Sequence, residues 1–172
     1  IALATFVLFY LMTVYIASWA ITDLNINRDD FLGNQIESVL LFAVFIPISA
    51  VLADRYGRKL ILIVASLGII LFGLVLGSLL NTSLLLTLSI GMALMGFTYG
   101  PLGTMLSELY PTNVRYTGSS LSFNFAGIVG ASFAPFIALW LSSNFGVHYV
   151  GYYLALAAII SLIATYLSSK AK

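Results

Sequence analysis

The chain has 172 residues, of which 61% are hydrophobic and 8% are charged, with a mean hydropathy of +1.07 and a net charge of +1. A water-soluble protein carries about 25% charged residues and could not bury this much apolar surface in one core, so the composition indicates a membrane protein. The sequence has no cysteine and one histidine, His148, which excludes a disulfide framework and thiol catalysis and argues against a histidine metal cluster. The small net charge gives no sign of a nucleic-acid interface.

Six apolar stretches are each long enough to cross a bilayer as a helix, which takes about 20 residues. They lack the strict alternation of a barrel strand, so an all-α integral membrane fold, a six-helix transmembrane bundle, is predicted. The first stretch begins at Ile1 without an initiator Met or a basic segment, and we therefore expect a fragment that starts within a helix rather than a signal peptide. The predicted spans are residues 1–21, 31–53, 60–80, 83–109, 119–142 and 147–167.

The basic residues between the spans predict the orientation of the bundle. Six of the seven fall on one side of the membrane and only Arg28 falls on the other. Because Lys and Arg are enriched in cytoplasmic loops, both ends of this chain are expected to be cytoplasmic. The six residues on the predicted cytoplasmic side are Arg55, Arg58, Lys59, Arg115, Lys170 and Lys172.

The second span carries the carboxylate that lies deepest in the predicted membrane. Glu37 is about 25 Å from Asp54 along that helix, at 1.5 Å per residue, and stands beside Asn34 and Gln35. A carboxylate inside a span is a functional candidate, so Glu37 is a candidate proton-coupling residue and Gln35 a candidate cavity residue. A glutamate that snorkels to the membrane surface is the competing interpretation.

The loop that follows this span concentrates charge. Asp54 lies at a helix C-terminus, where the helix dipole disfavours a negative charge, so it is expected to seek a cationic partner. Arg58 can hold a carboxylate with two parallel hydrogen bonds, and Gly57 permits a tight turn. The loop is therefore a candidate cytoplasmic gate, although basic residues that only fix the orientation explain it as well. The candidate gate residues of this loop are Asp54, Arg55, Gly57, Arg58 and Lys59.

The fourth span holds Tyr99, Gly100 and Pro101 near its centre. Glycine and proline interruptions at mid-membrane point to substrate sites in transporters, so Gly100 and Pro101 are a candidate helix interruption and Tyr99 is a candidate cavity residue. An ordinary helix kink is the alternative. Glu108 ends this span and Arg115 precedes the next, so the two can pair, either as part of the gate or as a static brace of the loop.

The fifth span has a small residue at every fourth position, a pattern that lets a neighbouring helix approach closely. Packing alone explains this stripe. Asn124 lies about 200° around the helix from Ser122, which belongs to the stripe, and therefore faces away from it. Because an amide is costly against lipid, we expect Asn124 to face a polar substrate cavity. The stripe consists of Gly118, Ser122, Ala126, Gly130 and Ala134.

Two runs of sequence resemble a known family. Residues 52–59 read LADRYGRK, which resembles the G-x-L-x-D-R-x-G-R-K signature of the major facilitator superfamily, with Ala50 in place of the first glycine. Residues 107–118 read SELYPTNVRYTG, which resembles the S-E-L-[FY]-P-T-x-V-R-Y-T-G run of the metabolite:proton symporter family. In that family the run lies between helices ten and eleven, so the chain is similar to helices seven to twelve, the C-terminal half.

The resemblance implies one half of a twelve-helix secondary transporter in the inner membrane. It implies symport of a small metabolite (an organic acid, a betaine or an amino-acid-like compound) with a proton, by alternating access about a site at mid-membrane. The proton is the coupling ion and no cofactor is implied. The implied partners are the N-terminal half of the same transporter, the small-molecule substrate and the lipid bilayer, with no nucleic acid.

Two other classes of function compete with transport by alternating access. A membrane channel is one, although a channel would show no charged gate loops of this kind. An intramembrane protease is the other, because residues 130–133 partly resemble the G-x-S-G motif of the rhomboid proteases. The final glycine of that motif is missing, Ser132 lies deep within a predicted helix, and His148 stands at the outer start of another.

Overall fold

The computed structural model describes residues 1–168, which form helices and turns and no strand. Six helical spans are long and apolar enough to cross a membrane, which confirms the predicted all-α fold class. The spans overlap the predicted stretches: the second, third and fifth are longer by two to four residues at each end, the sixth is identical, and the first and fourth differ by one or two residues at each end. They are Leu3–Thr22, Arg28–Tyr56, Arg58–Thr82, Leu84–Glu108, Arg115–Phe145 and Val147–Leu167.

Four spans are single α-helices and two contain a π-helical segment. The single helices are α3 (Arg28–Tyr56), α4 (Arg58–Thr82), α5 (Leu84–Glu108) and α8 (Val147–Leu167). The first span consists of α1 (Leu3–Tyr10), η1 (Leu11–Tyr15) and α2 (Ile16–Thr22). The fifth consists of α6 (Arg115–Gly127), η2 (Ile128–Ser132) and α7 (Ala134–Phe145). Each π-helical segment packs against an α-helix of the other span, since α1 contacts η2 and α7 contacts η1.

Local sequence accounts for where several helices begin and end. The Asn27 side chain accepts a hydrogen bond from the backbone N–H of Asp29 at 3.2 Å and caps α3, and Ser83 caps α5 in the same way. Gly57 separates α3 from α4, and Gly146 separates α7 from α8. Both glycines have φ of 98°, a conformation that other residues rarely adopt, so each allows one helix to end and the next to begin at once.

The core of the bundle surrounds the first span. Helix α1 contacts α5, α6, α7, α8 and η2, so it lies at the centre of the described chain. Its side chains and those of η1 fill the interior, and Leu8, Leu11 and Met12 have no exposed surface. In a water-soluble protein, burial of such a side chain contributes about 1.5–3 kcal/mol to the free energy of folding. Within a bilayer, where no water is displaced, close packing of the helices takes the place of this contribution.

Glycines bring two pairs of helices into backbone contact. In α4 and α8, a Cβ atom on Gly73 would come within 2.7 Å of the carbonyl oxygen of Gly151. In α3 and α5, a Cβ atom on Gly100 would come within 2.6 Å of the carbonyl oxygen of Ile46. Only glycine permits helices to approach this closely, and the Ser49 hydroxyl adds a hydrogen bond of 3.2 Å to the Gly96 carbonyl across the second contact.

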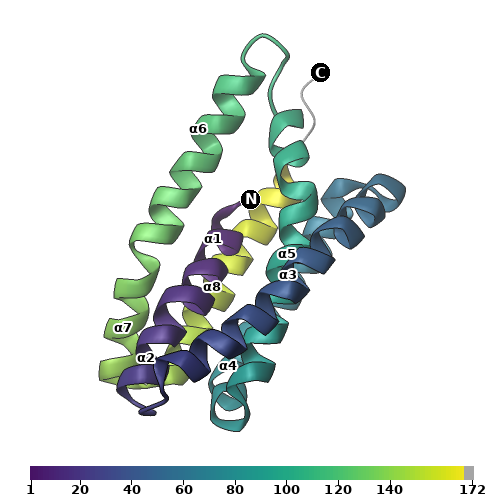
Figure 1. The fold of residues 1–172 in the computed structure, drawn as a ribbon. Coiled ribbons are helices and arrows are strands. Elements are labelled where there is room, and N and C mark those ends of the chain that lie inside the picture. Colours follow the sequence, from purple (N-terminus) through teal and green to yellow (C-terminus); the bar gives the residue numbers. More distant parts are fainter. Residues whose placement is uncertain (169–172) are drawn as a thin grey trace.

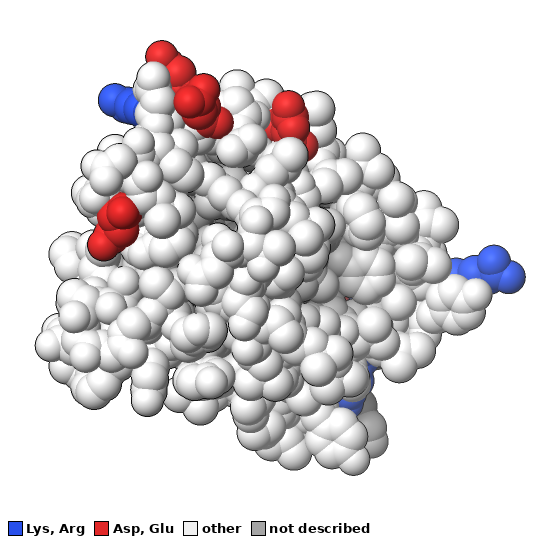
Figure 2. Space-filling view, turned by 90° about the horizontal axis from the view of Figure 1, so that it is seen from below, with Lys and Arg blue, Asp and Glu red and all other residues white. Residues whose placement is uncertain are grey.

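The turns and loops between the spans lie at two opposite ends of the bundle (Figure 1). The turn between α3 and α4 and the loop after α5 lie at one end, which we call the basic end. The turns between α2 and α3 and between α4 and α5 lie at the other, the acidic end, and Figure 2 shows the acidic side chains gathered there. The acidic end holds Asp23, Asp29 and Asp30 with Arg28; the basic end holds Arg55, Arg58, Lys59 and Arg115. Lys170 and Lys172 lie outside the described residues.

Burial is uneven among the spans. In their most apolar stretches, 56% of the first span and 50% of α4 are buried within this chain, against 17% of α3 and 17% of the span Arg115–Phe145. The two poorly buried spans therefore leave most of their surface to be covered by lipid or by another part of the protein.

Candidate functional site at the basic end

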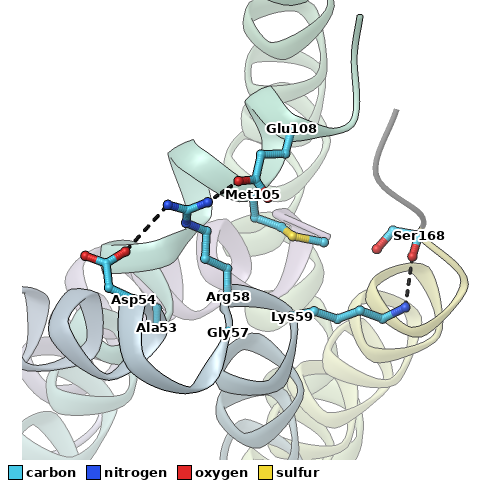
Figure 3. A pocket seen from close by; sticks show the side chains of 8 residues that line it. All are labelled: Ala53, Asp54, Gly57, Arg58, Lys59, Met105, Glu108 and Ser168. Carbon is cyan, nitrogen blue, oxygen red and sulfur yellow. Dashed lines mark hydrogen bonds and ion pairs between the residues drawn. The ribbon is translucent and has the colours of Figure 1, made fainter. Parts of the chain in front are cut away.

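Arg58 lies between two carboxylates at the basic end of the bundle (Figure 3). It is the first residue of α4, Asp54 lies in the last turn of α3, and Glu108 is the last residue of α5. The Arg58 guanidinium forms an ion pair with Glu108 through Nη1, and its Nη2 lies 3.5 Å from Asp54 Oδ1. We call Asp54, Arg58 and Glu108 the Arg58 cluster. It joins the ends of three helices through one side chain.

Each charge of the Arg58 cluster stands at the end of a helix that disfavours it. Asp54 and Glu108 lie at helix C-termini, where the dipole is negative, and Arg58 lies at an N-terminus, where it is positive. Each charge is therefore stabilised by its partners rather than by its own helix. The Glu108 and Arg58 side chains are 24% and 29% exposed, whereas Asp54 is 74% exposed, so water screens the Glu108 pair less than the Asp54 pair.

Lys59, the next residue of α4, has partners of a different kind. Its Nζ donates hydrogen bonds to the backbone carbonyl oxygens of Tyr166 at 2.7 Å and Ser168 at 2.9 Å, and it lies 5.7 Å from the centre of the Tyr166 ring. A cation at a helix C-terminus is favourable, so Lys59 caps α8. Between Lys59 and the Arg58 cluster is a pocket of about 280 Å³ that Met105 and Ser168 also line.

The two other predicted gate residues lie beside this arrangement. The Arg55 guanidinium lies 5.4 Å from the centre of the Tyr56 ring. Arg115 donates a hydrogen bond from Nε to the carbonyl oxygen of Tyr110 at 3.3 Å, and the ion pair described for Glu108 is with Arg58. The helices thus bring Arg58 to Glu108 across 50 residues of sequence, a contact between α4 and α5 that the spacing of the loop does not suggest.

The predicted cavity residues occupy three different environments. Tyr99 on α5 is 40% exposed, with its ring centre 5.8 Å from that of Phe42. Asn124 on α6 is exposed, donates to the Ser120 carbonyl at 2.8 Å, and lines surface pockets between α6 and α5 and between α6 and α1. Asn124 thus lies at the mouths of two surface pockets, and its contact with a substrate stays a prediction.

Gln35 and Glu37, two residues apart on α3, differ in exposure. Both polar atoms of the Gln35 amide are buried, and they have no hydrogen-bond partner within residues 1–168. Glu37 is exposed, about 14 Å from the start of α3 at 1.5 Å per residue. Glu37 is therefore accessible to a proton donor or to another part of the protein, whereas the Gln35 amide is not accessible in this conformation.

Gly100 and Pro101 do not interrupt α5. The helix is continuous from Leu84 to Glu108 with Pro101 inside it. Gly100 instead lies against the backbone of α3, so the glycine is explained by the close approach of two helices. A proline removes one backbone hydrogen bond, which an otherwise intact helix tolerates when its neighbours support it. The predicted interruption is therefore not found: the helix continues through Gly100 and Pro101.

Comparison with known proteins assigns the chain to a family. Residues 1–172 match the family model of the Major Facilitator Superfamily along their whole length. The chain belongs to the major facilitator superfamily. It is 42% identical over its full length to the Inner membrane metabolite transport protein YhjE of Escherichia coli and 38% identical to a Putative metabolite transport protein of Haemophilus influenzae. It is also 32% identical, over 91% of its length, to the Citrate-proton symporter of Klebsiella pneumoniae.

This major facilitator superfamily chain spans 41%, 43% and 37% of the lengths of those three relatives, respectively. The names of these relatives describe transport proteins. The six apolar spans of the chain agree with a multi-pass membrane protein. The residues of the protease alternative are not joined, since no hydrogen bond links Ser132 to His148 in the described part of the chain. Ser132 lines a pocket with Phe6, and the His148 ring lies against Gly77.

Proposed function

We propose that the full-length protein is a secondary transporter that carries a small metabolite together with a proton, and that this chain forms its C-terminal half. The observation that carries the proposal is the Arg58 cluster, in which one guanidinium joins the ends of α3, α4 and α5. The names of the relatives, which include a citrate-proton symporter, support transport of a metabolite coupled to protons. The substrate is an organic acid, a betaine or an amino-acid-like compound.

In this proposal the Arg58 cluster is part of a cytoplasmic gate. The excess of basic residues at this end favours a cytoplasmic position, and both ends of the chain would then be cytoplasmic. A charged contact shifts the balance between two conformations only by the difference in its energy between them. A difference of about 1–3 kcal/mol changes the ratio of the two conformations by about 5- to 150-fold, which is sufficient to control access from one side.

The poorly buried spans provide the surface for the other half. Span Arg115–Phe145 packs on the central helix α1 and α3 packs on α5, and the two spans carry Asn124 and Glu37, respectively, on exposed positions. A polar side chain inside a membrane is costly against lipid, so these positions favour contact with a water-filled cavity or with the N-terminal half. Tyr99 adds a partly exposed tyrosine on α5. We assign Tyr99 and Asn124 to substrate contact and Glu37 to proton coupling.

Uptake by the full-length protein in proteoliposomes tests the proposal. Organic acids and betaines are supplied with an inward proton gradient, with a sodium gradient, or with a protonophore. We expect accumulation of one of these compounds only with the proton gradient, and its loss with the protonophore. Accumulation that follows the sodium gradient and ignores the protonophore would contradict proton coupling.

Glu37→Gln tests the coupling residue within the same assay. This variant should lose accumulation driven by the proton gradient while it keeps exchange of substrate across the membrane, because exchange needs no net proton movement. Asp30→Asn is the matched control, since Asp30 is an exposed carboxylate in the first turn of the same helix. Full gradient-driven accumulation by Glu37→Gln would remove Glu37 from the mechanism.

A further inference from the structure

Tyr110 connects the loop after α5 to helix α6. Its ring lies against Gly118, where a Cβ atom would come within 2.5–2.8 Å of three ring atoms, so the ring occupies the space of a side chain. Its hydroxyl shares a hydrogen bond of 2.5 Å with the Ser122 hydroxyl, one helical turn further along α6. Two members of the small-residue stripe thus pack against a residue of their own preceding loop.

A second contact ties the same residue to the start of α6. The Arg115 side chain donates to the Tyr110 carbonyl oxygen at 3.3 Å, and the loop between them is closed by a turn in which the Val114 N–H donates to the Pro111 carbonyl at 3.1 Å. Within residues 1–168, these are the two side-chain hydrogen bonds that join α6 to a residue outside it, and both end on Tyr110.

Beyond these hydrogen bonds, α6 is held by apolar contacts: the centre of the Phe123 ring lies 4.9 Å from that of Phe6, and Phe123 and Ala126 pack against the cluster of Ala2, Leu102 and Leu106. None of its residues is buried within this chain, whereas α5 beside it has eleven buried residues. Asn124, which lies on the opposite side of α6 from Ser122, faces the surface pockets between α6 and its neighbours. A displacement of α6, as would follow from a substrate at Asn124, therefore acts on these apolar contacts and on the hydrogen bonds to Tyr110, and Tyr110 is the contact that continues into the loop after α5.

Tyr110 also stands two residues after Glu108, whose carboxylate forms the ion pair with Arg58. The backbone between them remains close to helical, because the Leu109 and Tyr110 N–H groups still donate to carbonyls of the last turn of α5, at 3.3 and 3.4 Å. A displacement of the Tyr110 ring would therefore also displace the end of α5, where Glu108 lies.

We propose that Tyr110 is a positioning residue that couples the placement of α6 to the ion pair between Arg58 and Glu108. The proposal rests on the proposed function, because it explains how occupation of the cavity would reach the gate. Its physical requirement is a measurable coupling between Tyr110 and Arg58, two side chains that have no hydrogen bond to one another in the described chain. A tyrosine that only braces its own loop would act independently of Arg58.

A double-mutant cycle in the full-length protein measures this coupling. Gly103→Cys, introduced where a Cβ atom meets nothing within 4 Å, reports the pocket between α5 and α6 through its rate of reaction with a water-soluble maleimide. Cysteines elsewhere in the full-length protein are replaced first. Tyr110→Phe removes only the hydroxyl, and Ser122→Ala removes its partner. Each is measured alone, and Tyr110→Phe is also combined with Ser122→Ala and with Arg58→Gln.

We expect Tyr110→Phe and Ser122→Ala each to change the labelling rate by about 2- to 10-fold, the range that corresponds to one hydrogen bond. The two changes should not add, because they remove the same bond. In the Arg58→Gln background, Tyr110→Phe should have less than half of this effect on a logarithmic scale. Tyr152→Phe is the matched control and should change nothing, since Tyr152 is a half-exposed tyrosine on α8 and does not line the pocket that Gly103→Cys reports.

An equal effect of Tyr110→Phe with and without Arg58 would overturn the coupling, and so would the absence of any effect. The maleimide reaction needs neither substrate nor a proton gradient. A failure of this inference is therefore distinguishable from a failure of the proposed proton-coupled transport, which the uptake assay measures separately.

Discussion

The contact between α3 and α5 has two different chemistries along its length. In the middle of the spans, Gly96 and Gly100 bring the two backbones together, and the Ser49 hydroxyl bonds to a backbone carbonyl. At the basic end, the same two helices finish at Asp54 and Glu108, and the charged side chain of Arg58 joins them. The close approaches in the first contact are between backbone atoms, which have no rotamers. The second contact is between side chains, which can change rotamer.

This difference indicates which part of the bundle is rigid and which part can rearrange. Backbone atoms in contact fix the distance between α3 and α5, and inside a membrane no water is present to replace that contact. Partly exposed charges can exchange each other for water at a cost of about 1 kcal/mol or less. We therefore expect α3 and α5 to move as one unit, while the position of α4 relative to their ends depends on the Arg58 cluster.

The largest effect is expected from breaking the backbone contact. Gly100→Ala would place a Cβ atom 2.6 Å from the Ile46 carbonyl and 3.0 Å from the Ala50 nitrogen, both backbone atoms that move only with the whole of α3. Overpacking of this kind costs about 1–3 kcal/mol. The apparent melting temperature of the purified protein in detergent should fall, and transport should fall with it.

Gly103→Ala is the matched control, three residues along the same helix, where a new Cβ atom meets nothing within 4 Å. Its melting temperature should equal that of the natural protein or exceed it, because alanine favours a helix over glycine by about 1 kcal/mol. If the two alanine variants were equally stable, the close approach of α3 and α5 would not be needed for folding.

The second effect concerns the charged end. Arg58→Gln should leave Glu108, which is 24% exposed, at an unfavourable helix C-terminus without its ion pair to Arg58. We expect a loss of about 1–2 kcal/mol in the free energy of unfolding, between the values for exposed and for buried pairs. Transport should fall more than stability, because the cluster is proposed to act on the balance of conformations. The double variant that combines Arg58→Gln with Glu108→Gln tests whether the two effects are separate.

Restoration of stability in that double variant, with transport still low, would separate the two roles of the cluster. With both charges removed, neither residue is left opposed to its helix dipole, so most of the lost stability should return. Normal transport in Arg58→Gln, at normal abundance in the membrane, would mean that the basic residues only fix the orientation of the bundle.

The sequence predicts the spans and the presence of a charged cluster, but not which charged residues pair with one another. Hydropathy is a local property, so six apolar stretches are sufficient to locate the helices. Arg58 and Glu108 are 50 residues apart, and only the packing of α4 beside α5 makes them neighbours. The sequence spacing suggests Arg115 as a partner of Glu108, whereas the contact of Glu108 with Arg58 comes from the packing of the helices.

Gly100 and Tyr110 are two further cases in which the sequence does not identify the residue that is contacted. A glycine before a proline is typical of a kink, and its contact with the backbone of α3 is visible only once the two helices are placed. The stripe that includes Gly118 and Ser122 predicts a close neighbour but does not say that the neighbour is the Tyr110 ring. Small-residue patterns specify that something approaches, and the fold specifies what does.

The smallest effect is expected at Lys59, which adjoins Arg58 but caps a helix rather than joining charges. Its hydrogen bonds go to backbone carbonyls of Tyr166 and Ser168, acceptors that α8 presents at its end whatever its side chains are. Lys59→Met keeps the apolar stem and removes the ammonium, so the loss should be that of a C-terminal cation, about 0.3–1 kcal/mol. Because α4 and α8 are also held by Gly73 and Gly151, transport should remain near normal. Lys59→Arg should restore the lost stability, since a guanidinium can donate to the same carbonyls. A loss of transport in Lys59→Met as large as that in Arg58→Gln, with both variants normally abundant, would show that the two neighbouring cations form one gate and that their different partners do not separate their roles.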